Sequence, residues 1–331
     1  MTAIAEIDLR PHALRIAGSA GAAPSLHNAQ PWALWVDVGA VQLWADPSRR
    51  AAVADPDGRQ MTISLGAALY SIRLELAELG LEPVVELLPD RERPDLVAVV
   101  TASGTASPDP ALHRLWAQLP RRRTVRDRMR AEVAATVRHE LTAHVNAEGC
   151  GLRWLDAVAD RRALATLAML AERTQQRDPR FLEELAYWVG AEALAAGAGV
   201  PGYALGPAGE AGHAAEFPMR DFGGGRRRLR ASAQRPEHHP VVAVLTTGSD
   251  GPRDWLRAGE ALMRLLLAAS GHGLAASYLN QPLEHRGLRA QVRTELALSG
   301  HAQLVLRLGR PLGPWPPATP RRPPAELLRD S

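Results

Sequence analysis

Two segments of the chain repeat each other at a fixed distance, and this repeat limits the possible folds more than any other feature. An offset of 193 residues superposes Gly66 on Gly259 and the Gly80-Leu81 pair on Gly273-Leu274. Apolar residues at 65, 69, 72, 76 and 79 are spaced by three and four and fall on one helical face. Each segment ends in Gly-Leu, which is typical of a helix stop. The repeat indicates a tandem duplication of one folding unit.

The surrounding pattern is that of two α+β units. The length of 331 residues exceeds what one compact core usually holds. Residues 32–38 and 41–45 flank Gly39 and predict a hairpin. The other expected elements are strands at 96–101, 151–155, 240–247 and 303–308, helices at 111–119, 132–147, 161–176 and 179–196, and a loop at 197–207. We expect one unit at 1–119 and a second at 120–331, with an insertion at about 209–234.

The basic side chains are unusual because the sequence contains arginine but no lysine. The formal net charge is +3 and the isoelectric point is about 9.6. Any anion site must therefore be built from guanidinium groups, which bind phosphate in a bidentate manner. A single cysteine, Cys150, excludes an intrachain disulfide. Residues 1–10 lack the apolar core of a signal peptide, and Arg264 and His272 interrupt the most apolar run, so we expect a cytoplasmic protein without a membrane span.

The most distinctive local motif is Ala-Pro-Ser-Leu-His-Asn-Ala-Gln-Pro-Trp at residues 23–32. Taken alone, it could be a hydrogen-bonded loop that leads into the hairpin. It also resembles the Pro-Ser-x-x-Asn-x-Gln-Pro-Trp signature of the nitroreductase family. The resemblance implies that Pro24, Ser25 and Asn28 reach across a dimer interface to FMN bound by the other copy.

A run of arginines lies where the second unit is expected to begin, at residues 121–126. Such a run is commonly a solvated face, and it can also bind nucleic acid. The absence of interleaved aromatic residues and the near-neutral net charge argue against nucleic acid. The nitroreductase family opens its fold with Arg-x-Ser-x-Arg, which Arg122-x-Thr124-x-Arg126 resembles, with threonine keeping the hydroxyl group. The resemblance implies that these three residues contact the flavin.

Two further segments have counterparts in the family. The basic pair Arg321-Arg322 resembles the C-terminal basic pair that binds the FMN phosphate. Asn280 and Gln281 follow the second repeat helix, where the family lines the flavin ring with backbone amides. The resemblance therefore adds these four residues to the expected cofactor site.

The two units carry complementary halves of this site. The first has the Pro-Ser loop but no Arg-x-Ser-x-Arg opening, whereas the second has the arginines but no Pro-Ser loop. This division, with the Ala-Asp-Pro-Asp-Gly-Arg segment at 54–59, resembles the Acg-like members of the family. It implies a nitroreductase-like α+β fold with central mixed sheets flanked by helices, one FMN per chain, and an internal pseudo-dimer that is compatible with a monomer.

The resemblance implies an oxidoreductase that uses NAD(P)H to reduce small electrophiles such as nitroaromatics or quinones. The alternative is a protein that sequesters FMN beneath a lid with little nicotinamide-dependent turnover, and residues 209–234 are the expected lid. No side chain is an evident general acid or base, so no catalytic residue is assigned. His238-His239 lacks further ligands at a telling spacing, and we expect no metal. The glycines at 223–225 lack the context of a phosphate loop.

Overall fold

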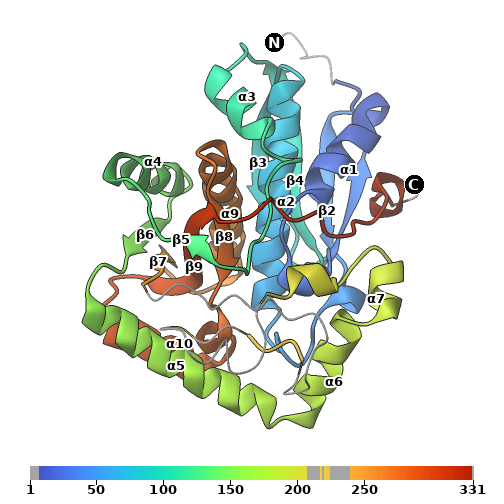
Figure 1. The fold of residues 1–331 in the computed structure, drawn as a ribbon. Helices are drawn as coiled ribbons and strands as arrows, with labels where there is room; N and C mark the ends of the chain where they lie inside the picture. The colour runs from blue at the N-terminus through green and yellow to red at the C-terminus, as the bar shows by residue number, and fades with distance from the viewer. Residues whose placement is uncertain (1–6, 207–216, 218–219, 224–238, 330–331) are drawn as a thin grey trace.

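The computed structural model describes residues 7–206, 217, 220–223 and 239–329. Of the expected lid at 209–234, only Phe217 and residues 220–223 fall within this part; the other residues of that prediction lie outside the described residues. The described chain forms two antiparallel sheets on either side of a central pair of long helices, α2 and α9 (Figure 1).

The two sheets share one strand order. The first contains β1 (Trp32–Val36), β2 (Ala40–Ala45), β3 (Leu81–Leu87) and β4 (Leu96–Thr105), in the order β1-β2-β4-β3. The second contains β5 (Met129–Arg130), β6 (Gly151–Trp154), β7 (Val241–Thr247), β8 (Ala275–Tyr278) and β9 (His301–Pro311). There β6 pairs with β7, β7 with β9 and β9 with β8, while β5 also pairs with β9. Without β5, the second sheet has the order β6-β7-β9-β8, which matches the order β1-β2-β4-β3 of the first. In the sequence, α2 lies between β2 and β3, and α9 lies between β7 and β8.

The strands pair antiparallel throughout the described part of both sheets. We expected mixed sheets, but parallel geometry is confined here to two isolated bridges, Leu34 with Leu328 and Thr124 with Ala276. Each bridge joins a strand to a segment distant in the sequence, so these parallel contacts fasten outlying segments to the sheets.

The helices α2 (Arg59–Glu78) and α9 (Pro252–Gly271) cross at the two repeat glycines. A Cβ atom on Gly66 would lie 2.0 Å from the carbonyl oxygen of Leu256, and one on Gly259 would lie 2.0 Å from that of Ile63. Ile63 and Leu256 are themselves separated by the offset of 193 residues found in the sequence. The contact is therefore reciprocal, as in an interface between identical surfaces related by a two-fold axis.

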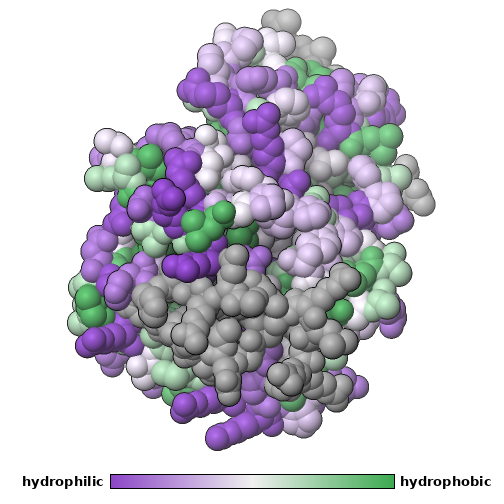
Figure 2. All heavy atoms as spheres, in the orientation of Figure 1, coloured by the Kyte–Doolittle hydropathy of each residue, from purple (hydrophilic) through white to green (hydrophobic). Residues whose placement is uncertain are grey.

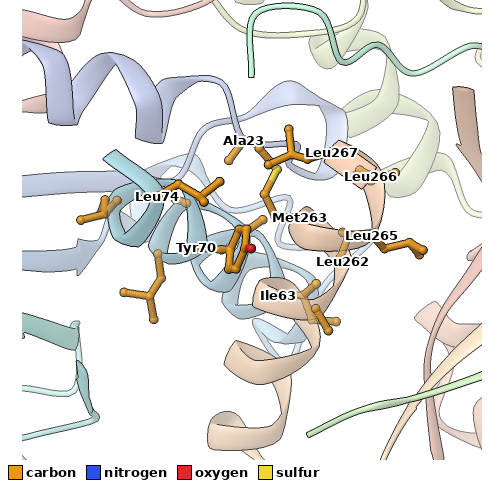
Figure 3. Close-up of a cluster of buried hydrophobic side chains, with 14 of the residues drawn as sticks. Ala23, Ile63, Tyr70, Leu74, Leu262, Met263, Leu265, Leu266 and Leu267 are labelled. Carbon is orange, nitrogen blue, oxygen red and sulfur yellow. The ribbon is translucent and has the colours of Figure 1, made fainter. Parts of the chain in front are cut away.

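Apolar side chains of these two helices form the centre of the largest core cluster. Figure 3 shows Tyr70 and Leu74 of α2 beside Met263 and Leu267 of α9. All four residues are buried. Because both faces of the crossing are apolar, burial of their surface stabilises the association of the two halves, at about 25 cal/mol per Å².

The segment at 54–59 fastens the start of α2 to the second sheet. The Asp55 carboxylate accepts the backbone N–H groups of Gln60 and Met61, as expected for an acidic residue at a helix N-terminus. The buried Arg59 donates to the backbone oxygen and the side chain of Gln303 on β9. This segment thus joins the two expected units.

The shorter helices surround this framework. They are α1 (Ala13–Gly21), α3 (Pro110–Trp116), α4 (Ala135–Asn146), α5 (Val158–Gln176), α6 (Pro179–Trp188), α7 (Ala191–Ala195) and α10 (Arg286–Glu295). Short 3-10 turns occur at Arg10–His12, Leu26–Asn28, Pro47–Arg49, Gly202–Ala204, Gln281–Glu284 and Pro324–Leu327. The prediction of a single helix at 179–196 was wrong, because extended backbone at Gly190 separates α6 from α7.

The chain after β9, which we call the C-terminal arm (residues 312–329), returns to the first unit. Figure 1 shows it crossing in front of α9 and α2 and ending beside α1. There the backbone N–H of Arg329 donates to the oxygen of Leu34 on β1, at 2.8 Å. The arm consequently carries residues 320–322 to the Pro-Ser loop.

The face shown in Figure 2 carries hydrophobic residues scattered among hydrophilic ones. Such single exposed apolar residues are ordinary on protein surfaces. Within the described residues, no helix is both long and apolar enough to cross a membrane.

Candidate functional site

A cavity of about 800 Å³ is lined by residues from both of the expected units. This volume lies within the usual range for sites that hold a small molecule or a cofactor. All of the expected binding residues line it, namely Pro24, Ser25, Asn28, Arg122, Thr124, Arg126, Asn280, Gln281, Arg321 and Arg322. The structure therefore brings together residues from four segments of the chain.

The Pro-Ser loop has a strained backbone. His27, Asn28 and Gln30 adopt positive φ angles of 51°, 58° and 51°. Each such non-glycine residue costs on the order of 1–3 kcal/mol, and strain of this kind concentrates at functional sites. The Ser25 hydroxyl accepts the backbone N–H of Gln30 at 2.9 Å, which helps to close the loop.

Side chains of this loop hold the C-terminal arm. The Asn28 amide nitrogen donates to the backbone oxygens of Pro320, at 2.8 Å, and Gly199, at 3.1 Å, while its oxygen accepts from the Arg321 guanidinium. The Gln30 amide oxygen accepts the backbone N–H of Arg322 at 3.0 Å. The Asn28 amide thus orients Arg321, a role that the expected direct contact with a flavin did not include.

Glycines allow the chain to approach the arm closely. Gly197 has a φ of +66°, and a Cβ atom there would lie 2.8 Å from the backbone oxygen of Arg321. The Gly197 oxygen in turn accepts the Gln30 amide at 2.7 Å. The loop, the arm and the segment after α7 therefore form one interlocked wall of the cavity.

Part of the cavity lining is strongly basic, because it includes Arg122, Arg123, Arg126 and Arg321. Arg122 is 7% exposed, and its Nε and Nη1 atoms have no hydrogen-bond partner in the described part of the chain. Burial, together with the neighbouring Arg122 and Arg123, lowers the pKa of Arg321 to about 9, and burial is the main cause that lowers the pKa of Arg126 to about 10. Among the described residues, no carboxylate forms an ion pair with any of these four arginines. Buried cations without acidic partners are costly, and a bound anion would remove that cost.

Arg322 and Thr124, two of the expected site residues, are held by contacts with the protein itself. The guanidinium of Arg322 donates to the backbone oxygens of Trp32, at 3.2 Å, and Glu326, at 2.6 Å. Its hydrogen bonds therefore fasten the arm to β1. Thr124 forms a parallel bridge with Ala276. The backbone N–H of the next residue, Val125, donates to the backbone oxygen of Ala276 at 3.0 Å. This bridge fixes the arginine run against the end of β8.

The segment after β8 forms another part of the cavity wall. The Asn280 side-chain oxygen accepts the backbone N–H of Val305 on β9 at 2.8 Å, which fixes the start of the 3-10 turn. Gln281 is 1% exposed and also lines the cavity. A rigid backbone of this kind is suited to placing amide groups against a planar ligand.

Aromatic residues line a further part of the cavity. The His27 ring stacks on Trp188 of α6, with centroids 6.2 Å apart, and meets Phe222 edge-on at 6.3 Å. Arg126 lies over the Phe222 ring, 5.1 Å from its centroid. The neighbouring Arg220 donates to Glu284 at 2.6 Å in a buried ion pair. The described part of the expected lid is thus anchored against the cavity.

Sequence reasoning missed several cavity residues. Tyr278, Arg123, His27 and Glu284 line the cavity, but none belongs to a position of the family motifs used. Arg123 could have been found because it lies within the arginine run. Tyr278 and Glu284 could not be found in this way, because a single tyrosine or glutamate outside any motif usually has a structural role.

We expect the free energy of unfolding to decrease at acidic pH because of His27. Burial, and then Arg220 and Arg126, lower its pKa well below the ordinary value of 6.5, so native His27 stays neutral. Below pH 6.5 the unfolded chain takes up a proton that the native state does not, which lowers the free energy of unfolding by about 1.4 kcal/mol per pH unit until the native pKa is reached. Urea unfolding at pH 7.5 and 5.5 should therefore show a larger loss in the wild type than in His27→Asn. Asparagine tolerates the positive φ, and equal losses in both proteins would contradict this assignment.

Comparisons with known proteins agree with the geometry. The protein "Putative NAD(P)H nitroreductase acg" of Mycobacterium tuberculosis is 30% identical over 325 residues, covering 92% of this chain and 92% of that protein. Another protein of that organism, also named "Putative NAD(P)H nitroreductase", is 33% identical over 318 residues, covering 93% of this chain and 90% of its own length. An uncharacterized protein of the same organism is 30% identical over 318 residues, with the same coverage. No established protein-family model matches the chain.

Proposed function

Because the chain belongs to the nitroreductase family, among its Acg-like members, we propose that it binds one FMN in the cavity between its two α+β units. The single observation that carries this proposal is the basic wall of the cavity. Arg122 is buried there, Arg126 and Arg321 are partly buried, and none of the three forms an ion pair with a carboxylate among the described residues. A phosphate group is the anion that guanidinium groups bind best, and FMN carries one at the end of its ribityl chain.

The residues present fit the rest of the cofactor. The apolar side chains of Leu26, Val200 and Phe222 line the same cavity and offer surface to a planar ring. The fixed turn at Asn280 and Gln281 offers backbone groups for the ring edge. The cavity thus combines an anion site with an apolar wall, as a flavin nucleotide requires.

We further propose that the two units arose by tandem duplication, at residues 1–119 and 120–331. Three observations support this: the offset of 193 residues, the shared strand order, and the reciprocal contact of Gly66 and Gly259. The cavity draws the Pro-Ser loop from the first unit and the arginines from the second. One chain would then supply both halves of one flavin site.

The activity that follows is reduction of small electrophiles, such as nitroaromatics or quinones, with NAD(P)H as the donor. FMN, when bound, supplies the acceptance and donation of hydride. The chain's own residues bind and orient: Arg122 and Arg321 neutralise the phosphate, Asn28 holds Arg321 in place, and the wall of His27 and Phe222 excludes water beside the ring.

The described part of the lid favours a second candidate, a protein that sequesters FMN. Phe222 contacts both His27 and Arg126 at the cavity, and Arg220 is held by a buried ion pair with Glu284. A segment fastened in this way would keep a nicotinamide donor from the flavin ring. The two candidates share the same site and differ in access to it.

One experiment separates the two candidates. The purified protein should carry a visible flavin band corresponding to one FMN per chain, and addition of NADH or NADPH without oxygen should bleach it within seconds. A band that persists with both nucleotides, yet bleaches with a small chemical reductant, would favour sequestration. Failure of the apoprotein to bind added FMN would contradict both candidates.

A further inference from the structure

The hydroxyl group of Tyr278 lies buried at the cavity without a hydrogen-bond partner among the residues that the structure describes. Tyr278 is the last residue of β8, and strand pairing with Leu306 fixes its backbone. A buried hydroxyl without a partner is uncommon, because the lost hydration costs about 1–3 kcal/mol. The position of Tyr278 at a cavity suggests that a ligand supplies the missing partner.

Three arginines that line the same cavity, Arg122, Arg126 and Arg321, act electrostatically on this hydroxyl. The parallel bridge between Thr124 and Ala276 lays the arginine run alongside the end of β8, and the arm brings Arg321 to the same place. Electrostatic effects of Arg122, Arg126 and Arg321 act on the phenol, although burial outweighs them and raises its pKa. Tyr278 is therefore a neutral hydrogen-bond donor at physiological pH.

The groups named here offer several donor hydrogens, since a guanidinium only donates and a neutral phenol has one hydrogen to donate beside its accepting oxygen. Guanidinium groups cannot accept a hydrogen bond, and two buried nitrogens of Arg122 also lack a partner within the described ranges. The hydroxyl hydrogen of Tyr278 and the N–H groups of Arg122 can therefore be satisfied by one ligand that carries several acceptors. A phosphate group has several acceptor oxygens and the opposite charge, so it can satisfy these donors together.

We propose that Tyr278 donates its hydroxyl hydrogen to the phosphate group of the bound flavin nucleotide, beside Arg122 and Arg321. This inference rests on the proposed function and adds to it a residue that distinguishes FMN from riboflavin. No bond is made or broken, and Tyr278 contributes only to binding.

The test compares the affinities of FMN and riboflavin, measured by quenching of flavin fluorescence, for the wild-type apoprotein and the variant Tyr278→Phe. Loss of one hydrogen bond to a charged group should raise the Kd for FMN about tenfold and leave the Kd for riboflavin unchanged. Tyr70→Phe is the matched control, because the Tyr70 hydroxyl is also buried without a partner but does not line the cavity. Its FMN affinity should equal that of the wild type.

The apoprotein gives a second readout. Removal of a buried hydroxyl without a partner should leave the thermal midpoint of ligand-free Tyr278→Phe unchanged or raise it, so a weaker affinity for FMN would not reflect a damaged fold. An unchanged Kd for FMN, or an equal loss for FMN and riboflavin, would overturn the assignment to the phosphate. A wild type that binds neither flavin would overturn the proposed function and this inference with it.

Discussion

Replacement of Gly259 by alanine is expected to lower the free energy of unfolding by about 3 kcal/mol, the upper end of the usual cost of overpacking. The added methyl group would lie 2.0 Å from the backbone oxygen of Ile63 and 2.7 Å from the backbone nitrogen of Ala67. Backbone atoms cannot turn aside as a side chain does, so α2 and α9 would have to separate. Gly66→Ala should have the same effect, because its methyl group would meet Leu256 at the same distance.

The control lies in the same helix. A Cβ atom on Gly271 of α9 would meet no heavy atom within 4 Å, so Gly271→Ala should leave stability unchanged or raise it by up to about 1 kcal/mol through helix propensity. Urea unfolding of the three variants and the wild type measures both effects. Similar stabilities for Gly259→Ala and Gly271→Ala would show that the helices do not cross as closely as described.

Replacement of Arg122 by alanine is expected to weaken FMN binding by about 100-fold, or about 2.7 kcal/mol, as for loss of charge-assisted hydrogen bonds. The ligand-free variant should be at least as stable as the wild type, because burial lowers the pKa of Arg122 and two of its nitrogens lack partners among the described residues. Opposite effects on affinity and stability distinguish a ligand-binding residue from a structural one. Calorimetric titration with FMN and thermal unfolding of the apoprotein measure the two quantities.

Three other arginines make this test specific. Arg321→Ala should weaken FMN binding to a similar degree, since Arg321 lines the same cavity. Arg322→Ala should weaken FMN retention as well as stability, because its guanidinium holds the arm to β1. Arg128 is exposed and lies near the same run, so Arg128→Ala should change neither quantity. Flavin content that is unchanged in Arg122→Ala would remove this residue from the site.

The sequence predicted the features that rest on local pattern. The helix periodicity around Leu69 and Leu262 marked α2 and α9, and the turn at Gly39 marked the hairpin of β1 and β2. The motif residues were found together at one cavity, since each motif occupies a fixed place in a shared fold. Whether they bind FMN remains a prediction.

Other features depend on contacts that a linear pattern does not contain. The contact of Asn28 with a flavin stays a prediction, and the sequence did not indicate that its amide also holds Pro320 and Arg321, which are distant in the sequence. The break before α7 at Gly190 lies inside an amphipathic run that reads as one helix. Tyr278 lacks a motif, and only the position of the surrounding arginines gives its hydroxyl a role.

The contact between Asn28 and Arg321 spans 293 residues. A growing polypeptide on the ribosome can therefore form the hairpin and the first sheet well before this wall of the cavity exists. Such distant pairings close slowly, because the entropy of ordering the intervening chain must be overcome first. Cofactor capture is thus expected to be a late, post-translational event. A chain that ends before residue 320 would keep much of the core but would lack the residues of the arm that contact the Pro-Ser loop. Flavin absorbance would then show that the arm has been synthesised and is bound to this loop.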